Sequence, residues 1–99
     1  MPAGPGTVVL DIGGDVGAAV ITAGDSCAGR ELEIRPAGAP WSGRHVAFHR
    51  RRTADGPVVA AVFPQLPAGD WEARMMGGRD VLRLSIRGGA VTTVELKAH

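Results

Sequence analysis

Tyrosine is missing from this 99-residue sequence, aromatic side chains make up 4% of it, and Cys27 is its one cysteine. A single cysteine cannot form a disulfide within the chain, so the fold is not a disulfide framework and we expect a reducing, cytoplasmic location. No stretch approaches about 18 consecutive apolar residues, which argues against a membrane-spanning helix. The opening residues lack the charged and apolar regions of a secretory signal, and we expect none.

The net charge is also low, because the sequence has 11 basic and 10 acidic residues and a formal charge of +1. This balance gives no reason to expect nucleic acid or a membrane surface as the partner. Lys97 is the one lysine and the other basic residues are arginines. That skew, with abundant alanine and glycine, is typical of a GC-rich bacterial genome. The length and the ordinary apolar content fit one globular domain over residues 1–99.

The sequence is rich in apolar residues that recur with a period of two, the pattern of half-buried β-strands, and no segment sustains a period of 3.6. The segments expected to form strands are 7–12, 16–22, 30–35, 45–51, 58–63, 71–75, 82–87 and 91–96. Their spacing of roughly 8–12 residues is typical of two packed sheets. We therefore predict an all-β fold, a single antiparallel β-sandwich of seven or eight strands.

The inward-facing positions of these segments predict the core. Residues 16–22 are apolar throughout, which indicates a strand that is central or covered on both faces. The predicted core residues are Val8, Leu10, Val20, Leu32, Ile34, Val46, Phe48, Ala61, Phe63, Leu66, Trp71, Leu82, Leu84, Ile86 and Val94.

Two prolines interrupt the chain between the apolar run 58–63 and the strand that begins at Trp71. Pro64 and Pro67 lack a backbone N–H, so neither suits a central ladder. Gly69 can supply the positive φ that a tight strand-to-strand connection often needs. This segment predicts the joint between two strands of a sandwich.

The joint, Phe-Pro-Gln-Leu-Pro-Ala-Gly-Asp-Trp over residues 63–71, resembles the F-x-x-L-P-A-G-x-Y joint of transthyretin-like sandwiches. Carboxypeptidase regulatory domains and B-type repeats of bacterial adhesins share that joint. Residues 84–96 are similar to the V-x-V-x-x-G-x-x-T-x-V-x-L ending of the same group. The resemblance implies a two-sheet architecture over the C-terminal 40 residues and carries no catalytic residue onto this chain.

The densest group of chemically active side chains is residues 44–52, Arg-His-Val-Ala-Phe-His-Arg-Arg-Arg. One interpretation is a metal site that uses His45 and His49. On a single strand, however, residues four apart lie about 13 Å from each other, and metal–nitrogen bonds are only about 2 Å long. The other interpretations are two solvent-facing histidines, and arginines that either pair with acidic neighbours across strands or bind phosphate or acidic peptides.

Catalytic patterns are missing from the sequence. The glycine doublets at 13–14, 77–78 and 88–89 precede no helix that would hold a phosphate, and we interpret them as turns. Ser26 and Ser42 lack a nucleophile elbow. Cys27 lies in a polar loop without an adjacent base, where exposure would make it oxidisable. We expect a protein that is not an enzyme and uses no cofactor.

Trp41 lies in the irregular, proline-rich segment 36–43, either as an anchor for a partner or as a lid over an open end of the sandwich. Aromatic residues and arginine are enriched at interfaces. We expect the contact region to be one surface neighbourhood, and the partner to be another protein or a second copy of this chain. The alternative is a small-ligand, carbohydrate or metal site at the open end, to which His45 and His49 contribute. The residues of the expected contact region are Trp41, Arg44, His45, His49 and Arg51.

Overall fold

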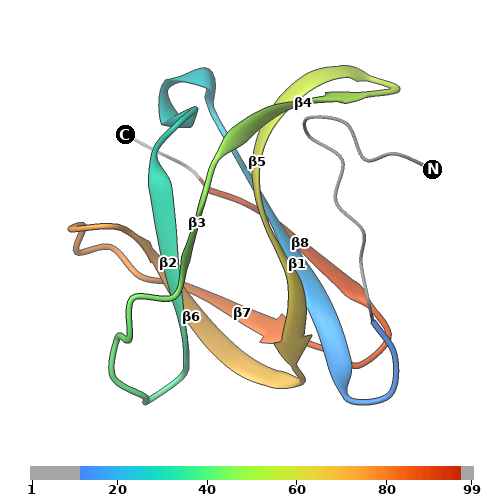
Figure 1. Cartoon of the computed structure of the whole chain (residues 1–99), viewed down its shortest axis with the longest axis vertical. Coiled ribbons are helices and arrows are strands. Elements are labelled where there is room, and N and C mark those ends of the chain that lie inside the picture. The colour runs from blue at the N-terminus through green and yellow to red at the C-terminus, as the bar shows by residue number, and fades with distance from the viewer. Residues whose placement is uncertain (1–11, 97–99) are drawn as a thin grey trace.

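A computed structural model describes residues 12–96 of the chain, and within them the fold is a sandwich of two four-stranded sheets (Figure 1). One short 3₁₀ helix, η1 (Asp25–Cys27), follows the first strand. None of the helical structure in this range is long and apolar enough to cross a membrane. The strands are β1 (Val16–Ala23), β2 (Glu31–Pro36), β3 (His45–Ala47), β4 (His49–Thr53), β5 (Gly56–Pro67), β6 (Gly69–Met75), β7 (Leu82–Ile86) and β8 (Val91–Glu95).

The first sheet has the order β4-β5-β1-β8 and the second sheet the order β3-β2-β6-β7. The predicted all-β sandwich is therefore confirmed. All neighbouring strands pair antiparallel except β1 and β8, which run parallel. The central strand predicted over residues 16–22 is β1, which lies between β5 and β8. The strand predicted over 7–12 falls outside the described residues.

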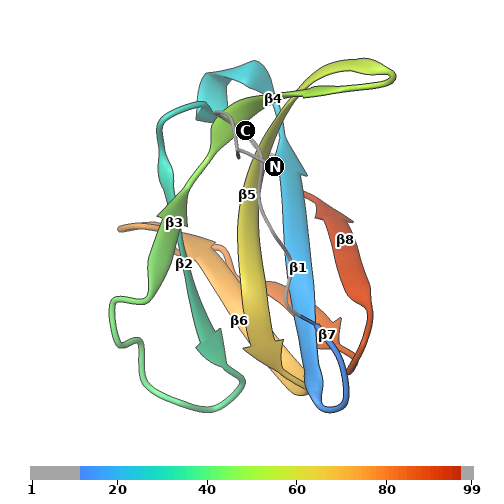
Figure 2. The ribbon, with the colours of Figure 1, turned by 45° about the vertical axis from the view of Figure 1, so that its right-hand side comes forward.

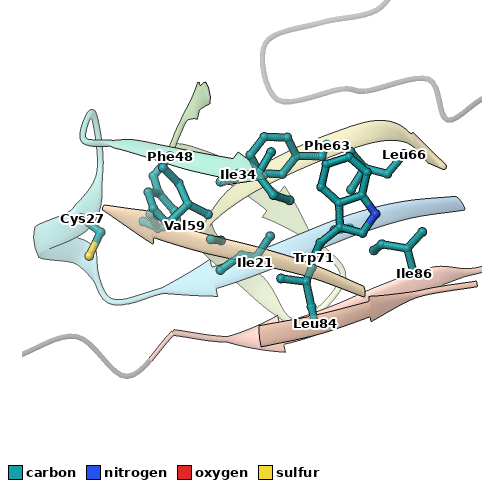
Figure 3. Packing of buried hydrophobic residues seen from close by; sticks show 14 residues of the cluster. Ile21, Cys27, Ile34, Phe48, Val59, Phe63, Leu66, Trp71, Leu84 and Ile86 are labelled. Carbon is teal, nitrogen blue, oxygen red and sulfur yellow. The ribbon is translucent and has the colours of Figure 1, made fainter. Parts of the chain in front are cut away.

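The core lies between the two sheets (Figure 3). Most predicted core residues are confirmed there, and Val46, Leu82 and Val94 pack against it while partly exposed. Val8 and Leu10 fall outside the described residues. The predicted residues that are buried are Leu32, Ile34, Phe48, Ala61, Phe63, Leu66, Trp71, Leu84 and Ile86.

The assignment of Val20 to the core is wrong. Ile21 is fully buried in the core, whereas Val20 is half-buried on the other face of β1. Successive side chains of a strand point to opposite faces, so only one of these two can reach the core. The one polar side chain in the run 16–22 is that of Thr22, which shares the face of Val20, and the apolar residues before it do not reveal this parity.

The prediction of one strand over residues 45–51 is also wrong, because the chain changes sheets at Phe48. The Phe48 N–H donates to the carbonyl of Arg30, and the Phe48 carbonyl accepts from the N–H of Gly29, both at 2.8 Å. Its ring is fully buried in the core. These contacts hold Phe48 between β3 in the second sheet and β4 in the first.

In the joint, both prolines lie in a part of β5 that is not central in the sheet, as their missing N–H groups predict. β4 pairs with residues 56–60 of β5 only, so the part of β5 that contains Pro64 has β1 as its one neighbour. The register between β1 and β5 shifts opposite Pro64, a β-bulge that accommodates the missing donor. Ala68 alone separates β5 from β6, Gly69 adopts a φ of 140°, and the indole Nε1–H of Trp71 donates to the Pro67 carbonyl at 2.9 Å.

Candidate functional site

The two sheets present chemically different outer faces, and the second sheet's outer face is lined by paired charges. Arg35 on β2 contacts Glu72 on β6 through both Nε and Nη2 at 2.9 Å. Arg74 on β6 contacts Glu33 on β2 at 3.1 Å. These residues are cross-strand partners, and the pairing leaves little net charge on this face.

Trp41 lies on this charged face, where its ring contacts the guanidinium groups of Arg35 and Arg74. Each guanidinium carbon is 4.1 Å from the ring centroid. The segment 36–43, which carries Trp41, is fixed to the second sheet because the Gly43 N–H donates to the buried carboxylate of Glu33 at 3.0 Å. The indole is therefore already in contact with two charged side chains, which fits a lid. That lid covers the outside of the second sheet instead of an open end of the sandwich.

The expected single neighbourhood of contact residues is wrong. Trp41 and His45 lie on the second sheet, where His45 Nδ1 is 2.6 Å from Glu31 Oε1. His49 and Arg51 lie on β4 in the first sheet. The sheet change at Phe48 separates the two groups.

Arg44 belongs to neither of these two groups and contacts the joint at residues 63–71. Its Nη2 donates to the Gln65 carbonyl at 2.9 Å, and its guanidinium lies 5.6 Å from the ring centroid of Trp71. His45 and His49 are both exposed, as one interpretation of the pair expects.

Along β1 and β5, the outer face of the first sheet is mostly apolar. Val62 pairs with Val20, and Ala60 pairs with Thr22, so these four side chains share a face. Val58 continues the row along β5, and the three valines are half-buried. We call the group Val20, Thr22, Val58, Ala60 and Val62 the valine face.

A shallow depression of about 600 Å³ lies over the valine face, with the β4–β5 hairpin at its rim. Arg51 is paired with Val58 across strands, and its Nε–H donates to the Ala60 carbonyl at 3.2 Å. Partial burial lowers the pKa of this guanidinium, which nevertheless stays charged at neutral pH. Arg52 and Asp55 complete the polar rim.

Sequence reasoning placed His49 and Arg51 in a contact region but missed the valines beside them. The signal was present: residues 58–62 are Val-Val-Ala-Ala-Val, apolar on both parities. Such a run predicts a strand with two covered faces, yet no helix or sheet of the described chain packs outside the first sheet.

Cys27 lacks the exposure that would make it oxidisable, because its side chain is fully buried at the end of η1 and belongs to the core. The loop around it is polar, but the 3₁₀ turn points the thiol inward. Among residues 12–96, no three or more His, Cys, Asp or Glu side chains are grouped closely enough to hold a metal ion.

Comparison of the chain with protein-family models, with curated proteins and with solved structures finds no match. The contrast between the two outer faces is therefore the feature of the described residues that bears on function.

Proposed function

We propose that this protein is a non-catalytic interaction module that binds a segment of another protein on the valine face. The observation that carries the proposal is the chemical difference between the two outer faces. On the second sheet, the arginines of two cross-strand ion pairs also contact the ring of Trp41, so these groups already have partners. On the first sheet, half-buried valines line a depression with arginines at its rim.

The chemistry of this face selects a kind of partner. Burying apolar area supplies about 25 cal/mol per Å², and the valines offer such area outside the core. Arginine forks bind carboxylates in a bidentate manner, and Arg52 is exposed at the rim. The expected ligand is an extended segment whose apolar side chains cover Val20 and Val62 and whose acidic residues meet Arg52.

A displayed library of random peptides tests this proposal, because it offers the valine face many extended segments at once. We expect the wild-type protein to enrich peptides with apolar residues flanked by Asp or Glu. Val62→Glu and Arg52→Glu should abolish the enrichment. Val81→Glu is the matched control, because Val81 is 44% exposed and lies in the β6–β7 connection, outside the valine face. Far-UV circular dichroism verifies that each variant is folded.

Two results would overturn the proposal: no enrichment by the wild type, or enrichment that survives both Val62→Glu and Arg52→Glu. A second candidate is a small apolar ligand with an acidic group, since the depression has a volume within the range of small-molecule sites. Titration with a fatty acid series would then show saturable binding that Val62→Glu removes, while the peptide library shows none.

We also infer that the sandwich is of transthyretin-like type. The support is the joint at residues 63–71, in which the prolines, Gly69 and Trp71 perform the turn and packing roles that the resembling motif implies. An experimental structure tests this inference, and a strand order that differs from that of transthyretin-like domains would overturn it.

A further inference from the structure

Among residues 12–96, strand β8 lies at the margin of the first sheet and has β1 as its one neighbour (Figure 2). The Ala18 N–H donates to the Ala90 carbonyl at 3.1 Å, and the Leu96 N–H donates to the Thr22 carbonyl at 2.7 Å. In a parallel ladder, alternate residues bond to a given neighbour, so the even-numbered residues face β1.

The N–H and C=O groups of Val91, Thr93 and Glu95 therefore point away from β1. No strand of the described chain pairs with that side of β8. Unpaired backbone groups of this kind attract a further strand unless the edge is protected.

The other three edges of the sandwich carry such protection. β4 has three consecutive arginines at 50–52. β3 is only three residues long. On β7, the Thr92 hydroxyl donates to the Ser85 carbonyl at 2.8 Å and occupies one acceptor. By contrast, β8 has the sequence Val-Thr-Thr-Val-Glu, with one charge at its end and Val91 41% exposed.

We propose that β8 pairs antiparallel with β8 of a second copy of this chain, so that the two first sheets join into one. A two-fold axis at Thr93 places Thr93 opposite its own copy and Val91 opposite Glu95. The outward residues then exchange both of their backbone hydrogen bonds. No like charges oppose each other, and threonine pairs across strands are favourable.

Self-complementarity identifies a second copy as the occupant. β8 carries no side chain that would select a foreign strand by charge, yet its own sequence matches itself across the axis. The same operation on β4 would place Arg51 opposite Arg51, which like-charge repulsion disfavours. This interface uses the backbone edge of β8, whereas the proposed ligand contacts the side chains of the valine face, where Val20 is the cross-strand neighbour of Thr93.

Sedimentation equilibrium up to about 1 mM protein measures the pairing. We expect the wild type to double its mass with rising concentration. Thr93→Lys and Thr93→Glu should each be monomeric, because each places like charges on the axis, and an equal mixture of the two should form heterodimers. Thr93→Val is the matched control and should still dimerise. A wild type that stays monomeric, or a Thr93→Lys variant that dimerises like it, would overturn the proposal.

Oxidative cross-linking tests the register independently. The Cα atoms of a directly opposed antiparallel pair lie about 5.5 Å apart, within the range that a disulfide spans. Thr93→Cys should form a covalent dimer under mild oxidation. Val91→Cys should not, because it lies opposite Glu95 and about 13 Å along the strand from its own copy. Equal cross-linking of both variants would contradict the two-fold axis at Thr93.

Discussion

A Cβ atom built on Gly88 would lie 1.7 Å from the carbonyl oxygen of Gly14. The turn that precedes β1 and the turn that precedes β8 therefore touch backbone to backbone. The Gly89 N–H also donates to the Val16 carbonyl at 2.9 Å. This contact brings the starts of β1 and β8 together, which is where their parallel pairing begins.

Gly88→Ala should therefore destabilise the protein by more than about 2 kcal/mol, as overpacking against a backbone typically costs 1–3 kcal/mol or more. Gly89→Ala is the neighbouring control. Its φ is +73° but no atom lies within 4 Å of the built Cβ, so the cost is limited to about 1–2 kcal/mol of backbone strain. Urea denaturation of both variants measures the difference. Equal costs would show that the turns separate easily.

Phe63→Ala should lower the free energy of unfolding by about 3–5 kcal/mol. Phe63 is 2% exposed and packs in the centre of the core (Figure 3), so truncation leaves a cavity between the sheets. Val81→Ala is the control, since that side chain is 44% exposed and its loss should cost less than about 0.5 kcal/mol. A loss below about 1 kcal/mol at Phe63 would mean that the core rearranges to fill the space.

Trp41→Ala should cost about 1–2 kcal/mol, because two guanidinium groups each lose a cation–π contact with the ring, worth about 0.5–1 kcal/mol. Trp41→Phe should recover part of this loss. Peptide binding on the valine face should be unchanged in both variants, since Trp41 lies on the other sheet. Loss of peptide binding without loss of stability would restore Trp41 as the anchor.

Glu33→Gln should destabilise the protein by about 1.5–3 kcal/mol, the usual contribution of a hydrogen bond to a charged group. Glu33 is 5% exposed and accepts from both Arg74 and the Gly43 N–H. Glu31→Gln is the matched control, because its side chain is 47% exposed and pairs only with His45. Thermal denaturation distinguishes the two, and similar melting temperatures would argue against a structural role for the buried carboxylate.

The Cys27 thiol should react slowly with a disulfide reagent in the native state and rapidly in urea, because it is fully buried. The release of the reagent's own thiol, followed at increasing urea concentration, measures the rate at which Cys27 reacts. Rapid reaction without denaturant would show that η1 opens readily in solution.

The sequence alone determined the class of fold and most of the core. Strict alternation in 30–35 and 82–87 specifies which side chains face inward, because a strand repeats every two residues. The prolines and Gly69 specify the joint through their backbone chemistry. Such local constraints act within a few residues and are readable without a structure.

Tertiary structure decided the rest. Val20 and Ile21 are equally apolar, and packing against the second sheet selects Ile21 for the core. The sheet change at Phe48 depends on backbone partners at Gly29 and Arg30, which no local pattern announces. The contact of Gly14 with Gly88 likewise joins distant segments. The candidate site depends on the same tertiary features. The sheet change places Trp41 and Arg51 on different sheets, and the parity of β1 and β5 places the valines on the outer face.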